Sequence, residues 1–293
     1  KLGPAAGNRA ELDSTWAPHW SSLLGYWKLN DNFQDSGPNA FHGSLSGTGT
    51  VTFEENSRIG SHAARTSGNT MMSMTHDNLM NLTNSLSISA WIKLDSYAAG
   101  YATHPITKFH AITNSPFTFY VFGSVDSAGN PCPSCPGIAR FMATAGGAWV
   151  TISGTYKLAL GQWYHVGLSY DAALGGQLYI NGEKIEGRAG SGTLANNTMP
   201  LRLFGNGAAN QFGGSLDEVA IWNASLSDQD MKLIYDRQSA KYAGEYQSPV
   251  IDLGASGDWT GLSASTPLPF FKGLPASSGS ESGSDYSAVS PNL

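Results

Sequence analysis

The segment from Gly214 to Met231 constrains the fold more than any other part of this chain. Its first half has the two-residue period of a β-strand, with Leu216, Glu218, Ala220 and Trp222 on one side and Asp217, Val219 and Ile221 on the other. Ser227 then stands where a helix N-cap would stand, and Asp228 and Asp230 fall in the first helical turn. The segment therefore predicts a buried strand, a short turn and a capped helix.

Several other segments alternate in the same way. Asn181 and Gly182 supply the two positive-φ residues of a type I′ turn, so 177–185 is the clearest hairpin. Short strands separated by turn residues are typical of two packed sheets. We therefore predict an all-β protein, a two-sheet antiparallel β-sandwich with one short helix near the C-terminal end of the domain. The remaining strand segments are 86–94, 118–122, 162–170 and 201–204.

Composition excludes two classes of partner. The net charge is −6, and the 16 Lys and Arg residues form no basic cluster, so we expect no nucleic-acid partner. No run of about 18 apolar residues occurs, so we expect no membrane insertion. The first residues, Lys1 to Pro4, have neither a signal-peptide shape nor an initiator Met, which suggests a mature fragment or an excised piece.

Five motifs follow one another along residues 23–238. In this order they resemble the laminin-G-like, concanavalin A-like jelly rolls, and the resemblance implies one such domain over 23–238. The motifs are 25–43 with its Asp-Ser-Gly turn, Ser87–Lys93, Gly161–Val166, Leu178–Gly182 and Leu216–Val219.

The flanking segments differ in composition. Residues 1–22 are interpreted as an N-terminal connector, and 239–293 as a C-terminal extension toward a following module, because Ser, Gly and Pro dominate 274–285. The stretch 275–291 can be aligned with 4–18 when one-residue gaps are allowed. This suggests one unit of a tandem array.

Glycosidases share this sandwich, so paired carboxylates are the first chemistry to test. Asp217 and Glu218 are adjacent and should therefore lie on opposite faces of their strand. No Gly-x-Ser-x-Gly nucleophile motif is present either. The sequence predicts a protein that is not an enzyme.

The family resemblance implies a structural calcium ion. Carried over position by position, its ligands would be the carboxylates of Asp35 and Asp217 and the backbone carbonyls of Asn39 and His42. The alternative is that Asp35 caps its own turn through an Asx bond and that Asp217 accepts hydrogen bonds from backbone amides.

The chain has two cysteines, Cys132 and Cys135. They fit a redox pair or half of a zinc site poorly, because the pair lies among prolines and no second Cys pair exists. We predict a small disulfide that closes a loop in an oxidising compartment.

Ligand contacts are expected on irregular loops that carry aromatic residues. The segment 95–114 is long and aromatic, and the cysteine loop leads on to Trp149. The candidate ligand-binding residues are Tyr101, His104, Phe109 and Trp149. The alternative is that these side chains plug the edges of the sandwich.

These expectations combine into a non-catalytic recognition module of an extracellular or cell-surface protein. It would bind a glycan or another cell-surface ligand in adhesion and would contact neighbouring modules of the same protein. The alternative is a structural spacer or oligomerising unit of a repeated surface fibre. A glycoside hydrolase is the third possibility.

Overall fold

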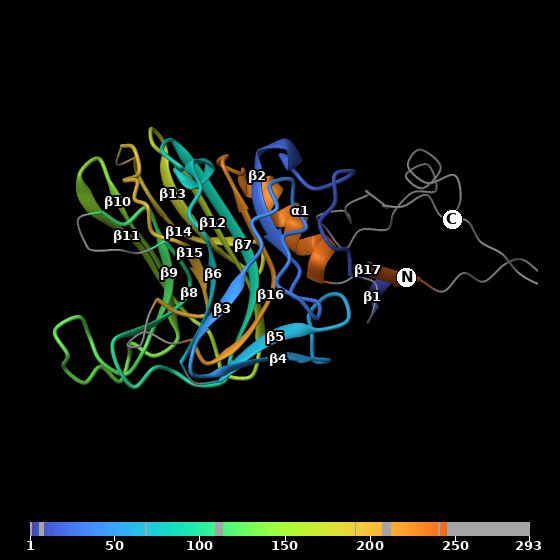
Figure 1. Ribbon diagram of the computed structural model, residues 1–293, viewed down its shortest axis with the longest axis horizontal. Coiled ribbons are helices and arrows are strands. Elements are labelled where there is room, and N and C mark those ends of the chain that lie inside the picture. Colours follow the sequence, from blue (N-terminus) through green and yellow to red (C-terminus); the bar gives the residue numbers. More distant parts are fainter. Residues whose placement is uncertain are drawn as a thin grey trace, which may run out of the picture. The chain divides into compact units, whose positions relative to one another are not determined.

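The computed structural model describes residues 2–5, 9–67, 69–108, 114–190, 192–206, 212–239 and 241–244 (Figure 1). The chain divides into one unit over Leu2–Ala243 and a second formed by Lys1 and Gly244–Leu293. Beyond Gly244 the predicted C-terminal extension lies outside the described residues, as does the predicted alignment of 275–291 with 4–18.

Two antiparallel sheets form the body of the first unit (Figure 1). One sheet has seven strands in the order β11-β10-β9-β8-β15-β6-β3. Its strands are β3 (Ser44–Gly47), β6 (Thr70–Met74), β8 (Ala102–Thr107), β9 (Thr118–Phe122), β10 (Ile138–Ala145), β11 (Ala148–Lys157) and β15 (Leu201–Leu203).

The second sheet has eight strands in the order β14-β13-β12-β7-β16-β5-β4, and β2 pairs with β16. Its strands are β2 (Leu23–Trp27), β4 (Thr50–Glu54), β5 (Ala63–Ser67), β7 (Ser85–Leu94), β12 (Trp163–Asp171), β13 (Gly175–Ile180), β14 (Glu183–Arg188) and β16 (Gly214–Trp222). Two short strands, β1 (Leu2–Ala5) and β17 (Lys241–Gly244), pair with each other. The helices are the 3-10 turns Trp20–Ser22 and Asn78–Met80 and the α-helix α1 (Asp228–Ser239).

The core lies between the two sheets, as the alternating pattern predicts. Along β7, Ile88, Ala90 and Ile92 belong to the central apolar cluster, whereas Ser89 and Trp91 face outward. The predicted two-sheet sandwich with one short helix is thus confirmed.

The predicted hairpin and helix cap are also confirmed. Asn181 and Gly182 have φ values of 52° and 76°, and they join β13 to β14. At the start of α1, the Ser227 hydroxyl accepts from the Asp230 amide at 3.1 Å, and the Asp230 carboxylate accepts from the Ser227 amide at 2.9 Å. This reciprocal pair satisfies two amides that the first helical turn leaves free.

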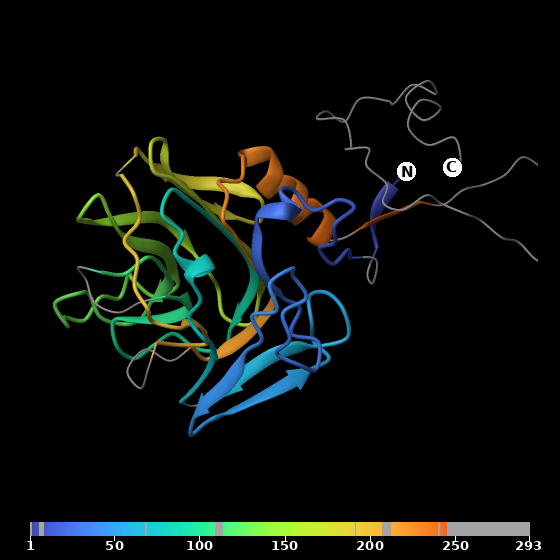
Figure 2. The same cartoon turned by 45° about the horizontal axis from the view of Figure 1, so that its top comes forward.

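The segment predicted as an N-terminal connector packs on the eight-stranded sheet. Figure 2 shows the segment that precedes β2 beside α1, over the eight-stranded sheet. Leu12 and Trp16 are buried there in an apolar cluster with Trp222 of β16 and Met231 of α1. Apolar side chains in 9–22 therefore cover the outer face of this sheet.

A β-bulge in β16 changes the predicted alternation. The register shifts between Asp217 and Ala220, and Glu218 has φ 55°. Leu216 and Val219 both face the core, so Asp217 and Glu218 both face outward, and both are completely buried. The prediction that these two acids lie on opposite faces is wrong, because the bulge inserts an extra residue into the strand.

Candidate ligand-binding face

The outer face of the seven-stranded sheet carries a group of aromatic side chains. Along β9, Phe119 and Val121 point into the core, so Tyr120 and Phe122 point outward. On the neighbouring strand β10, Arg140 pairs with Tyr120 in the register of the sheet and also faces outward. The strand period therefore brings these three side chains together on one surface.

Tyr101, His104, Tyr120 and Phe122 form what we call the aromatic cluster. The Tyr101 ring meets Phe122 edge to face, with ring centres 5.0 Å apart, and lies 5.9 Å from Tyr120. The His104 ring stacks on Tyr120 at 5.8 Å. Tyr120 and Phe122 are buried, while Tyr101 is half-buried, so Tyr101 forms the accessible edge of the cluster.

Arg140 adds a positive charge to the aromatic cluster. Its guanidinium carbon lies 4.0 Å from the centre of the Phe122 ring, in cation–π contact. Its Nε is buried and has no hydrogen-bond partner among the described residues. The side chain as a whole is half-buried, so the guanidinium is fixed by the ring beneath it while it still borders solvent.

Two polar groups of the cluster are uncharged because they are buried. Burial lowers the pKa of His104 to about 4, and its Nδ1 lies 2.8 Å from the Thr118 hydroxyl. Burial, with the Tyr101 hydroxyl 3.4 Å away, raises the pKa of Tyr120 above its usual range. The imidazole and the phenol therefore lie uncharged beside the Arg140 guanidinium.

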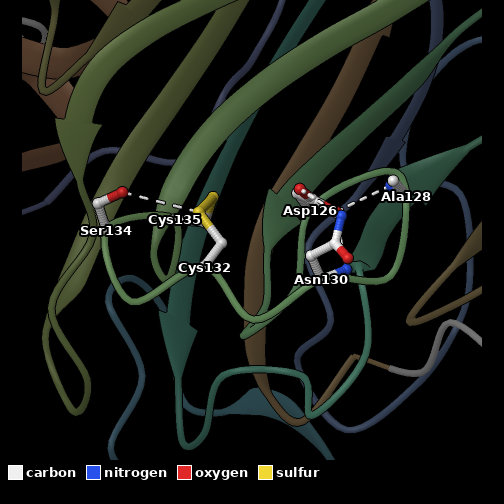
Figure 3. The surroundings of a disulfide bond; sticks show 6 residues. All are labelled: Asp126, Ala128, Asn130, Cys132, Ser134 and Cys135. Carbon is white, nitrogen blue, oxygen red and sulfur yellow. Dashed lines mark hydrogen bonds between the residues drawn. A yellow bond between two sulfur atoms is a disulfide. The ribbon is translucent and has the colours of Figure 1, made fainter.

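The loop between β9 and β10 borders the cluster. Cys132 and Cys135 form a disulfide in this loop (Figure 3). Cys135 packs against the aromatic cluster. Earlier in the loop, the Asp126 carboxylate accepts from the amides of Ala128 and Asn130, both at 2.9 Å. These bonds close the loop on itself beside the outer face.

The predicted ligand-binding residues are only partly brought together. Tyr101 and His104 belong to the cluster. Tyr101 lies immediately before β8, and His104 lies within β8 rather than in the irregular loop predicted for 95–114. Trp149 is half-buried on the same face of β11, paired with Thr144 of β10. Phe109 lies outside the described residues.

Sequence reasoning missed Tyr120, Phe122 and Arg140. A signal was present in 138–144, where Ile, Arg, Met and Thr alternate with small or aromatic core residues. That alternation would have placed Arg140 on the outer face.

The predicted calcium ligands do not fit a calcium ion as they are arranged. Both oxygens of Asp35 accept backbone amide hydrogens, at 2.8 Å from Tyr26, 2.7 Å from Gly37 and 2.9 Å from Phe41. Such donors neutralise the carboxylate and point hydrogens where a cation would lie. These bonds hold the 35–41 turn against β2, which is the alternative role that the sequence left open.

The other predicted ligands are used in similar ways. The Asn39 side-chain amide donates to the carbonyl of Leu24 at 2.8 Å, and His42 Nδ1 accepts from the amide of Asp35 at 3.1 Å. Asp217 Oδ2 accepts from the amides of Arg58 and Ile59, at 2.8 and 2.9 Å, and only its Oδ1 has no partner. No cluster of three His, Cys, Asp or Glu side chains suited to a metal occurs among the described residues.

The acid pair on β16 is enclosed by protein. The Glu218 carboxylate accepts a hydrogen bond from the Tyr26 hydroxyl. It also accepts one from the side-chain amide of Gln238 in α1, at 3.3 Å. Burial, and for Glu218 the neighbouring Asp217, raises the pKa of both carboxyls well above the usual range. The two acids thus share a face, but α1 and the N-terminal segment separate them from solvent.

A hollow of about 290 Å³ lies elsewhere, at the β3–β4 edge. Its lining consists of aliphatic, glycine and hydroxyl residues, without a charged or aromatic side chain: Leu45, Ser46, Gly47, Gly49, Thr50, Val51 and Thr70. It offers less specific chemistry than the aromatic cluster, which remains the candidate site.

Comparison with known proteins places the fold in a family. Residues 66–232, more than half of the chain, match the family described as the concanavalin A-like lectin/glucanases superfamily. The chain belongs to this superfamily. A search of curated proteins found no match. Within the described residues, no helix is long and apolar enough to cross a membrane.

Several solved structures share this fold. One is domain 4 of AbnA, an extracellular arabinanase from Geobacillus stearothermophilus, in complex with arabinotriose. It shares 20% identity with a TM-score of 0.56, over 73% of this chain and 98% of that chain. Another is the binding domain of Paraclostridial Mosquitocidal Protein 1, at 16% identity and a TM-score of 0.56, over 74% of this chain and 52% of that chain.

A third is the binding domain of botulinum neurotoxin DC in complex with SialylT. It shares 15% identity with a TM-score of 0.54, over 75% of this chain and 52% of that chain. This superfamily member therefore spans about half the length of the two toxin domains. At these identities the likeness establishes the fold alone.

Proposed function

We propose that this protein is a non-catalytic glycan-recognition module of an extracellular or cell-surface protein, acting in adhesion. The observation that carries the proposal is the aromatic cluster with Arg140 on the outer face of the seven-stranded sheet. Solved structures of the same fold in complex with arabinotriose and with SialylT support this class of ligand.

The chemistry of the cluster suits a sugar. An aromatic ring such as that of Tyr101 can stack on the C–H face of a pyranose, and the Tyr101 hydroxyl can exchange hydrogen bonds with sugar hydroxyls. The burial of Tyr120 and Phe122 fixes the site before binding, which lowers the entropy lost when a ligand is ordered.

A non-catalytic role is supported by the position of the carboxylates. Glycoside hydrolysis requires two carboxyl groups on either side of the scissile bond. Asp217 and Glu218 are completely buried, Asp217 against the backbone of Arg58 and Ile59 and Glu218 against Gln238 of α1, so a polysaccharide cannot reach them without displacement of the covering segments.

The test is a glycan array probed with the full chain, followed by titration of the best ligand. We expect Tyr101→Ala to weaken binding about tenfold, since one aromatic contact contributes about 1.5 kcal/mol. Tyr156→Ala is the matched control: Tyr156 is 40% exposed on β11, and its ring packs edge to face on Tyr164 of the other sheet.

Thermal unfolding of both variants must stay cooperative. Binding that is lost equally in the two variants would place the site elsewhere. A folded protein that binds no glycan would contradict the proposal and would favour the structural spacer.

A further inference from the structure

The two sheets differ sharply in charge. The seven strands that carry the aromatic cluster contain no Asp or Glu, although the chain as a whole has 22 acidic residues and a net charge of −6. The eight-stranded sheet contains six of them: Glu54, Asp171, Glu183, Glu186, Asp217 and Glu218. The strands that carry the cluster thus contribute no acidic side chain to its surroundings.

Basic side chains remain on this acid-free sheet. Arg140 borders the cluster, and Lys157 lies on the next strand, opposite Ile138, which packs against the cluster. Arg202 faces outward from β15, since Leu201 and Leu203 on either side of it point into the core. Among the residues that the structure describes, none of these three cations belongs to an ion pair.

The Arg140 guanidinium is held in place at the edge of the cluster. Phe122 supports one face of it, and the Tyr120 hydroxyl accepts a hydrogen bond from it. A planar guanidinium can donate two parallel hydrogen bonds to a carboxylate or a sulfate, and it keeps its charge at every physiological pH. A ring beneath the fork reduces the side-chain entropy lost when those bonds form.

The nearest loop does not neutralise this charge. Asp126 lies in the β9–β10 loop, and its carboxylate is directed at the amides of Ala128 and Asn130 within that same loop. It forms no ion pair with Arg140 or Lys157 in the described part of the chain.

We propose that the site selects glycans whose sugar carries an anionic group, a carboxylate or a sulfate, bound by the Arg140 guanidinium with Lys157 beside it. The sugar ring stacks on the accessible edge of the aromatic cluster at Tyr101. This inference rests on the proposed function and adds the class of ligand to it.

The experiment uses two matched pairs of probes and the full chain. The first pair is trigalacturonic acid and its methyl ester. The second is a 6-sulfated galacto-oligosaccharide and its desulfated form. We expect the charged member of at least one pair to bind at least tenfold more tightly at low salt, and that preference to fall as salt is raised. The pair that shows the preference identifies the anion.

Variants then assign the preference to a residue. Arg140→Gln is expected to reduce the ratio of the two affinities to about one, while Arg140→Lys retains part of it because the charge remains without the planar fork. Lys184→Gln is the matched control, since Lys184 is an exposed cation on β14 of the other sheet. The Lys184→Gln protein should show the same ratio of charged-probe to uncharged-probe affinity as the unaltered protein.

The outcomes separate this inference from the proposed function. Binding of neutral glycans on the array through Tyr101, without any preference for a charged probe, overturns the anionic selectivity and leaves the proposed function standing. A preference that survives Arg140→Gln also overturns it. The absence of any glycan binding overturns both.

Discussion

The guanidinium of Arg140 lies 4.0 Å from the centre of the Phe122 ring, on the neighbouring strand of the sheet. The two side chains reach each other because β9 and β10 pair in a register that directs both outward. The buried ring thus fixes the orientation of the half-buried cation beside it.

Replacement of Phe122 by Leu should separate ligand binding from stability. The variant loses the ring that orients Arg140, so we expect affinity for a glycan to fall about fivefold, with a loss of about 1 kcal/mol in the free energy of unfolding. Phe119→Leu is the matched control on the same strand, because Phe119 faces the core. It should lose similar stability and bind normally in isothermal titration. Equal affinities in the two variants would contradict a role for Phe122.

His165 should make the fold sensitive to acid. It is completely buried on β12, its Nε2 lies 2.8 Å from the Ser89 hydroxyl, and burial lowers its pKa to about 3. The unfolded chain takes up a proton near pH 6.5, whereas the folded chain does not until about pH 3. Stability is therefore complete above pH 6.5 and falls as the pH drops toward 3.

The matched variant is His165→Gln, whose amide can still bond to Ser89 but cannot take up a proton. By the linkage relation, the difference in unfolding free energy between the two proteins should change by about 2–3 kcal/mol from pH 7.5 to pH 4.5. Urea unfolding at a series of pH values measures it. Parallel pH profiles for the two proteins would show that His165 is not responsible.

Reduction of the Cys132–Cys135 disulfide should affect the site more than the fold. A loop this short gives an entropic stabilisation of about 2 kcal/mol. Cys135 packs against the aromatic cluster, so release of the loop should also weaken glycan binding several-fold. Cys132→Ser/Cys135→Ser, tested by thermal unfolding and titration, is expected to behave like the reduced protein. Unchanged affinity would remove the loop from the site.

Removal of calcium should leave the domain unchanged. Because backbone amides already surround the carboxylate oxygens of Asp35, we expect the melting temperature in a chelator to match that in millimolar calcium. Asp35→Asn serves as a comparison and should lower the melting temperature equally in both buffers. If calcium raised the melting temperature of the unaltered protein but not that of Asp35→Asn, the calcium ligand set predicted from the sequence would be supported.

The sequence predicts those parts of the fold that depend on local spacing. The type I′ turn at Asn181-Gly182 and the cap at Ser227 are each encoded within a few residues, so they could be predicted. The bulge at Asp217 could not, because the extra residue is accommodated through pairing with β7 rather than through a local turn sequence.

The candidate site was predictable only in part for a similar reason. Tyr101 and His104 stand out as aromatic residues in one segment, but Tyr120 and Arg140 join them only once the order of β8, β9 and β10 is known. That order depends on contacts between strands that lie far apart in the chain, which the period of a single strand does not specify.

The pairing of β1 with β17 has a mechanical consequence. Tension transmitted along the polypeptide from both sides would act first on this ladder of two four-residue strands. Such a ladder is held by few backbone hydrogen bonds and would yield before the two large sheets. It would act as a short extensible tether, which lets a module under shear lengthen slightly while its outer face keeps its shape.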